Sequence, residues 1–115
     1  MTRVSVHRVE VSGDAGLRSA QALADQLREA LAAHEAIAIV TEAVTSADIT
    51  TIQLLLSARK QAAELHKSLS LAAPPTGVLR DLLIATGCLS IDGKPLTPDG
   101  DFWTPQADQA EENAA

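Results

Sequence analysis

Short apolar runs alternate with longer segments in which apolar residues recur every three or four positions, and this alternation constrains the fold more than any other feature. Strands are indicated at residues 3–11, 36–40 and 69–72, and helices at 17–33, 50–66 and 78–86. Strand-like runs that alternate with helical patterns are typical of α/β folds with parallel strand pairing. We therefore predict one α/β domain with a small, mostly parallel central sheet and three or four helices packed against it.

Three details of the pattern make more specific predictions. The alternation of the first strand shifts by one position near His7 and Arg8, which indicates a bulge or bend there. The run at 36–40 is apolar at every position, so we expect that strand to be central and covered on both faces. The apolar stripe of the first helix begins at Leu17, which places this residue on the side expected to face the core.

Aromatic side chains are nearly absent. They make up 2% of the 115 residues, against 46% for all apolar types, so the core of this single domain must be aliphatic. Turn formers and small polar residues follow Leu89, so we expect residues 1–104 to form the domain and residues 105–115 to form a disordered acidic tail. The two aromatic residues, Phe102 and Trp103, are expected to fold back over an edge of the core.

The charge distribution argues against nucleic acid as a partner. Fifteen acidic and nine basic residues give a net charge of −6, and no segment offers the concentrated basic face that phosphate binding requires. No apolar run is long enough to span a membrane, and no secretory signal is recognisable. The single cysteine, Cys88, suits a reducing compartment. We therefore expect a cytoplasmic protein that does not insert into a membrane.

Residue types that usually carry catalysis are sparse and scattered. The histidines and Cys88 are far apart in the sequence, so no metal site is predicted, and His34 and His66 are expected at helix ends, where imidazole suits the helix dipole. Cys88 follows a helix-ending glycine and is expected to be a buried, inert thiol. Neither a glycine-rich nucleotide loop nor a G-x-S-x-G motif occurs. The chain is therefore predicted to be a non-enzyme without a cofactor.

The segment 40–56 has the most organised polar pattern in the chain. A buried strand ends, a short polar loop follows, and a helix begins near Asp48 with hydroxyl residues on both sides of it. Thr50 and Gln53 have the spacing of a capping box, and helix capping alone would explain the pattern. The alternative is a switch, because a phosphate on Thr50 would meet the free amides of the helix start and would repel a docked partner beside Asp48.

One stretch of this segment resembles the centre of a STAS domain, and it reads Asp48-Ile49-Thr50-Thr51-Ile52 followed by Gln53-Leu54-Leu55-Leu56. STAS domains form the fold shared by anti-sigma factor antagonists and by small subunits of lipid-asymmetry ABC transporters. The likeness runs from about residue 9 to residue 89 and includes a final strand and helix at 67–83 and a Gly-x-Leu ending at 87–89. It implies a STAS-like fold and a regulatory module that binds other proteins.

The resemblance also implies roles for particular residues. In the family, the second residue after the aspartate is the regulatory phosphorylation site, which assigns that role to Thr50. The partner-binding residues that the resemblance implies are Ser46, Asp48, Thr50, Thr51, Gln53, Ser57 and Lys60. The chain departs from the family pattern at Ile49, Thr51 and Val40, and its N-terminal region has one strand where longer members have a hairpin.

Three kinds of protein partner follow from the resemblance. The first is an anti-sigma factor or a related histidine-kinase-like ATPase, controlled by phosphorylation of Thr50. The second is the ATPase of a lipid-transporting ABC complex, on which the chain would dock without phosphorylation. A role as a chemotaxis signalling accessory is a third alternative, since fold alone does not choose among functions. A homodimer is also left open.

Overall fold

A computed structural model describes residues 6–98 and 100–105, and it contains the predicted alternation of strands and helices. A 3-10 turn at Leu17–Ser19 precedes the first helix. The elements in chain order are β1 (Val6–Glu10), β2 (Gly13–Asp14), α1 (Ala20–Ala33), β3 (Ala36–Val40), β4 (Val44–Ser46), α2 (Ile49–Glu64), β5 (Ser68–Leu71), α3 (Gly77–Ala85) and α4 (Gly100–Trp103). The α/β fold class is therefore confirmed.

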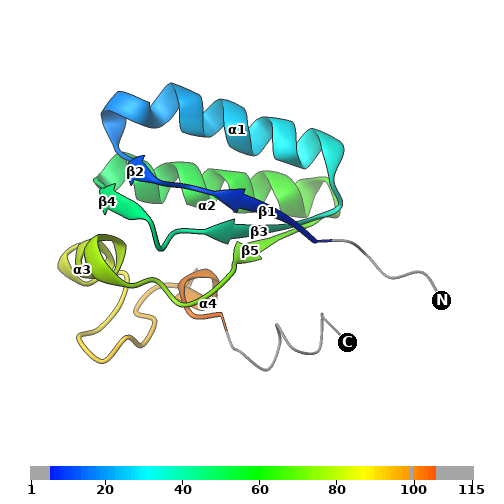
Figure 1. Ribbon diagram of the computed structural model, residues 1–115. Helices are drawn as coiled ribbons and strands as arrows, with labels where there is room; N and C mark the ends of the chain where they lie inside the picture. The colour runs from blue at the N-terminus through cyan, green and yellow to red at the C-terminus, as the bar shows by residue number, and fades with distance from the viewer. Residues whose placement is uncertain (1–5, 99, 106–115) are drawn as a thin grey trace.

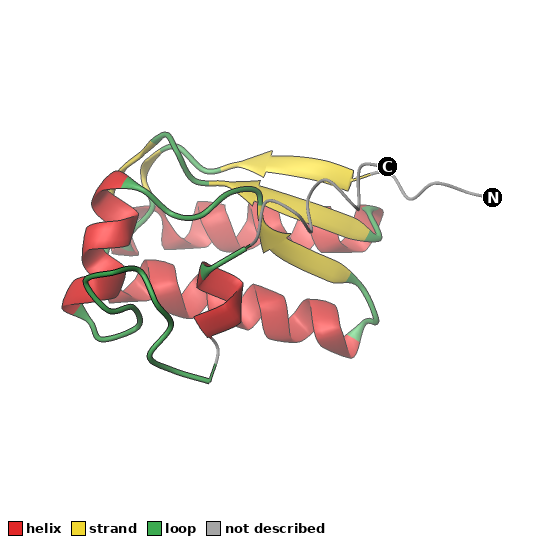
Figure 2. Cartoon of the chain, turned by 90° about the horizontal axis from the view of Figure 1, so that it is seen from below, coloured by secondary structure: helices red, strands yellow, loops and turns green. Residues whose placement is uncertain are grey.

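The central sheet has three parallel strands in the order β1-β3-β5, and β2 and β4 form a second, very short parallel pair. Helices α1 and α2 lie side by side against one face of the central sheet (Figure 1). Figure 2, which views the chain from below, shows the same layering, with α4 beside β5. The register aligns Val9 with Ile39 and Ile39 with Leu71, so buried side chains from all three strands form one row.

The core is aliphatic apart from the two aromatic residues near the C-terminal end of the described chain. Leu23, Leu27 and Leu31 of α1 meet Leu55 of α2, and all four are almost fully buried. Burying each of these leucine side chains is worth about 1.5–3 kcal/mol relative to exposure. The leucines of the two helices on this sheet face are thus a main part of the apolar core.

Two predictions about the strands are wrong. The register of β1 against β3 is continuous over Val6–Glu10, and the irregularity lies instead between Gly13 and Asp14, where β2 pairs with β4. The strand β3 is central, but Ala38 and Val40 are only half-buried, because among the described elements α1 and α2 cover one face of the sheet. The face of β3 away from these helices carries Ala38 and Val40, which are also apolar. The sequence therefore shows no apolar–polar alternation that would have indicated an uncovered face.

The first helix begins later than its apolar stripe. Leu17 lies in the 3-10 turn and its side chain is 70% exposed, so the prediction that it faces the core is wrong. The turn is held by Ser19 N–H, which donates to the carbonyl oxygen of Gly16. The regular helix, α1, starts at Ala20 and buries its stripe from Leu23 onward.

The C-terminal part of the described chain folds back on the body, as predicted. Trp103 is 1% exposed and packs edge-on against Phe102, with ring centroids 4.9 Å apart. Gly100 lies so close to Pro95 that no side chain would fit. Residues 106–115 of the predicted tail lie outside the described residues.

Cys88 is half-buried, so the prediction of a buried thiol is wrong.

Candidate functional site

Asp48 organises the start of α2. Its Oδ1 accepts a hydrogen bond from the Thr50 N–H at 2.9 Å, and its Oδ2 accepts one from the Leu17 N–H at 2.9 Å. The Asp48 N–H in turn donates to Thr51 Oγ1 at 3.1 Å, which completes a capping box between Asp48 and Thr51. The prediction of a capping box from Thr50 to Gln53 is therefore wrong, because the helix begins two residues earlier than that spacing assumes.

Thr51 links this helix start to a segment far away in the sequence. Its hydroxyl donates to the carbonyl oxygen of Ala15 at 2.7 Å, and the side chain is 1% exposed. A buried hydroxyl that both donates and accepts a hydrogen bond satisfies groups that would otherwise be costly to bury. Thr51 thus positions the loop and the helix from inside, and it does not present its side chain to the surface.

The loop before α1 is held by two carboxylates, those of Asp14 and Asp48. Asp14 Oδ1 accepts a hydrogen bond from the Gly16 N–H at 2.8 Å. A Cβ atom on Gly16 would lie 2.6 Å from Asp48 Oδ2, which is closer than such atoms can approach. Residue 16 must therefore be glycine for the carboxylate to reach the Leu17 N–H.

The Asp48 carboxyl group is stabilised as the anion. The hydrogen bond from the Leu17 N–H, together with weaker ones from the Thr50 and Thr51 N–H groups and the Thr50 hydroxyl, lowers the pKa of Asp48, and partial desolvation opposes them. Asp48 is therefore ionised at neutral pH, and a second negative charge on Thr50 would lie directly beside it.

The outward side of α2 carries a continuous exposed stripe. Ile49, Gln53, Ser57 and Lys60 follow one another at spacings of three or four residues, and all four are exposed. Of the sequence-predicted site residues, Ser46 is also exposed, while Asp48 and Thr50 are half-buried at the head of the stripe. The structure thus brings these predicted residues onto one helix and the loop before it.

Two apolar residues at this site were missed by the sequence reasoning. The side chains of Leu17 and Ile49 are 70% and 53% exposed. Ile49 directly follows Asp48 in the chain, and the Leu17 N–H donates to the Asp48 carboxylate. The signal available in the sequence was the position of Ile49 next to the N-cap, outside the stripe of Ile52 and Leu55.

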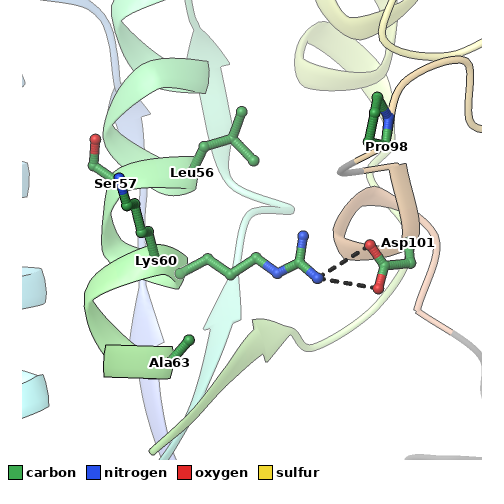
Figure 3. A pocket seen from close by; sticks show the side chains of 7 residues that line it. Leu56, Ser57, Lys60, Ala63, Pro98 and Asp101 are labelled. Atoms are coloured by element: carbon green, nitrogen blue, oxygen red, sulfur yellow. Dashed lines mark hydrogen bonds and ion pairs between the residues drawn. The ribbon is translucent and has the colours of Figure 1, made fainter. Parts of the chain in front are cut away.

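An open groove runs along the other side of Ser57 and Lys60. It has a volume of about 520 Å³ and lies between α2 and the segment that leads into α4, as Figure 3 shows. Its lining residues are Leu56, Ser57, Arg59, Lys60, Ala63, Pro98 and Asp101. The Arg59 guanidinium donates to both carboxylate oxygens of Asp101, at 3.1 and 3.0 Å, and lies 5.6 Å from the centre of the Phe102 ring. The groove wall is therefore built by contacts between α2 and α4.

Other chemistry is sparse in the described part of the chain. His7 and His34 stack with ring centroids 3.8 Å apart, but no third ligand joins them, and residues 6–98 and 100–105 contain no group of three side chains suited to a metal ion. His66 closes α2 in the left-handed conformation, with φ of 59°. No helix in the same residues combines the length and apolarity needed to cross a membrane.

Comparison with known proteins agrees with this architecture. A solved structure of the anti-sigma factor antagonist SpoIIAA in its unphosphorylated form is similar in fold, with a TM-score of 0.59 and 14% sequence identity. The match covers 99% of this chain and 93% of that one. No curated protein matches the sequence. The family model described as "Mlab, STAS domain" matches residues 2–89, and the chain therefore belongs to the STAS-domain family.

Proposed function

We propose that this chain is a cytoplasmic, non-enzymatic binding module that docks on a signalling ATPase of the anti-sigma-factor type. The docking surface consists of the loop and helix from Ser46 to Lys60. The observation that carries the proposal is the start of α2, where the Asp48 carboxylate binds the backbone N–H groups of Leu17 and Thr50, and the Leu17 and Ile49 side chains stand exposed. An aliphatic anchor beside a polar stripe is the usual composition of a protein interface.

Phosphorylation of Thr50 would act as the release step in this proposal. Thr50 is the second residue of α2, so a phosphate there would meet the positive end of the helix dipole, and the fold would tolerate it. The same phosphate would add nearly two negative charges next to the Asp48 carboxylate, in the middle of the docking surface. The partner would meet both charge repulsion and a desolvation cost. A structural neighbour, SpoIIAA, is described as an anti-sigma factor antagonist in its unphosphorylated form, which supports the choice of partner class and of a phosphorylation switch.

A second function is favoured by a different observation. The matching family model is described as "Mlab, STAS domain", and the residue after Asp48 is Ile49 where regulators of the family have a hydroxyl. In this alternative the chain is a subunit that docks on the ATPase of a lipid-transporting ABC complex. The same α2 surface would form a permanent contact, and the Thr50 hydroxyl would only support the Asp48 cap. The groove beside Ser57 and Lys60 would widen that contact.

The test is an affinity capture from the native cytoplasm with the wild-type chain and the Thr50→Glu variant. Thr76→Glu is the control, because Thr76 is a threonine at the start of another helix, α3, and its side chain is exposed. We expect wild type and the control to retain a histidine-kinase-like ATPase and Thr50→Glu to lose it. Retention of an ABC-type ATPase with its membrane subunits would move the chain to the second function.

Phosphopeptide mass spectrometry on the chain from its native cells separates the two functions further. Under the first function a fraction of the chain carries phosphate on Thr50, whereas under the second none does. Equal capture of one partner by wild type and Thr50→Glu would contradict the switch. Loss of partner with Leu17→Glu or Ile49→Glu, alongside unchanged circular dichroism, would still place the partner on this surface.

A further inference from the structure

The edge of the central sheet formed by β1 is open in the described structure. Within residues 6–98 and 100–105, β1 pairs with β3 alone, whereas α4 lies beside the opposite strand, β5. No described strand pairs with this edge, and the Gln26 side chain of α1 reaches it at the Glu10 carbonyl oxygen. An open strand edge presents unpaired N–H and C=O groups, which are a template for another strand.

The direction of the backbone groups shows which residues would pair. The Val11 N–H donates to the carbonyl oxygen of Val40, so the odd-numbered residues of this segment point their backbone groups toward β3. The groups of Arg8 and Glu10 therefore point away from the sheet. The Glu10 carbonyl confirms this direction, because it accepts a hydrogen bond from the exposed Gln26 side chain at 3.2 Å.

The side chains on this strand are complementary to a second copy of themselves. Arg8 and Glu10 are both exposed and lie on the sheet face that α1 and α2 leave uncovered, one position on either side of the buried Val9. When two copies of β1 meet antiparallel with Val9 opposite Val9, Arg8 of each copy lies opposite Glu10 of the other. The backbone groups of these same two residues then form the hydrogen-bonded pairs of the ladder.

Other registers lack this match. A shift by two residues in one direction places Arg8 opposite Arg8, and a shift in the other direction places Glu10 opposite Glu10. A shift by one residue would put side chains of the open face opposite those of the helix-covered face. Opposite charges that face each other across a strand pair stabilise it, and like charges destabilise it. The charge pattern thus selects a single register.

From this geometry we infer that the chain forms a two-fold symmetric dimer in which β1 pairs antiparallel with β1 of a second copy. The result is a continuous sheet of six strands with two ion pairs and four backbone hydrogen bonds at the joint. In two of these bonds the Glu10 carbonyl oxygen exchanges the Gln26 side chain for the Arg8 N–H of the other copy. The α2 surface and the groove beside α4 lie on the far side of each copy and stay accessible. One dimer would therefore offer two partner-binding surfaces, which raises its avidity for a partner that is itself dimeric.

The dimer is expected to be weak, because a single strand pair buries less area than a standard interface. We expect a dissociation constant on the order of 100 µM. Sedimentation equilibrium in about 0.15 M salt measures it, since that salt screens the repulsion between two acidic chains beyond about 8 Å. Arg8→Glu and Glu10→Arg each turn two attractive pairs into two repulsive ones. Either variant alone should dimerise about tenfold or more weakly than wild type.

The decisive arm is the mixture of the two variants. Arg8→Glu supplies two glutamates and Glu10→Arg supplies two arginines, so the mixed dimer restores opposite charges at both positions and should regain wild-type affinity or better. Arg28→Glu and Glu64→Arg are matched controls, because they make the same changes in net charge at exposed helix positions. They should dimerise like wild type, and mixing them should change nothing.

Three results would overturn the inference. The first is a wild-type chain that stays monomeric up to about 1 mM, ten times the expected dissociation constant. The second is a dimer that neither reversal weakens, and the third is a mixture no tighter than its components. Amide hydrogen exchange gives an independent reading, since exchange at Arg8 and Glu10 should slow with rising protein concentration in wild type and not in Arg8→Glu.

Discussion

Replacing Thr51 by valine tests whether the buried hydroxyl holds the site together. Valine has nearly the same shape, so no cavity forms and the fold around residue 51 stays packed. The hydroxyl makes two hydrogen bonds, to the Ala15 carbonyl oxygen at 2.7 Å and from the Asp48 N–H at 3.1 Å. Each such bond contributes about 1 kcal/mol, and leaving the buried Ala15 carbonyl without its donor adds to the loss. The free energy of unfolding should fall by about 2–3 kcal/mol.

Urea denaturation followed by circular dichroism measures this change. With a slope near 1 kcal/mol per molar urea, as expected for a domain of this size, the midpoint should fall by about 2–3 M with no change in slope. Thr51→Ser is the matched control, because it keeps the hydroxyl and removes only a methyl group, at a cost of about 1 kcal/mol. The valine variant should therefore be the less stable of the two.

The opposite order would refute the reasoning. If Thr51→Val is as stable as wild type while Thr51→Ser is weaker, the residue contributes through its methyl group, and the link between the Ala15 loop and α2 carries little energy. The same two variants also test whether this hydroxyl matters for partner binding. Thr51→Val should weaken partner capture because the Ala15 loop, which leads to Leu17, loses its hydrogen bond to α2, whereas Thr51→Ser should bind normally.

Three further predictions concern the same fold. Gly16→Ala should lower the free energy of unfolding by about 1–3 kcal/mol in urea denaturation, because its Cβ displaces the Asp48 carboxylate, and an unchanged midpoint would contradict the close approach. The pKa of Asp48 is lowered from 3.8, so the ionised carboxylate stabilises the folded chain above that pH, and this stabilisation is lost as the pH falls through the folded-state pKa. The difference in unfolding free energy between wild type and Asp48→Asn should therefore shrink to zero at acidic pH. A difference that stays constant with pH would exclude the carboxylate as its source. Trp103→Ala should cost about 3–5 kcal/mol and lower the melting temperature by more than about 10 °C, and a small shift would mean that α4 docks only loosely.

Local patterns in the sequence were enough for the regular elements. The residues of β3 at 36–40 were predicted with the observed bounds, and α2 was predicted within a few residues at each end. Helix α2 is long and has a helical period, and β3 is a short apolar run bounded by polar residues, so both can be recognised from neighbouring residues alone. The very short β2, β4 and α4 lack any such period, and only contacts with distant segments make them regular.

The candidate site divides in the same way. The sequence placed a helix start near Asp48 and put Gln53, Ser57 and Lys60 on one helix, because capping chemistry and helical spacing are local properties. The capping box is closed by Thr51, whose hydroxyl also donates to the carbonyl oxygen of Ala15. Ala15 lies 36 residues before Thr51, so the residues around Thr51 do not reveal this contact. The exposure of Leu17 had the same cause, since the Asp48 carboxylate holds its N–H outside the regular helix.

The sequence by itself determined the fold class, the aliphatic core and the position of the polar helix start, because hydrophobic periodicity and capping chemistry act between near neighbours in the chain. The tertiary structure decided which side chains of that helix start are buried, which aliphatic residues stand exposed beside it, and which edge of the sheet is open. Those properties depend on how segments far apart in the sequence approach one another. One carboxylate that joins two loops, and one strand with a single partner, gave this domain the surfaces through which it is proposed to act.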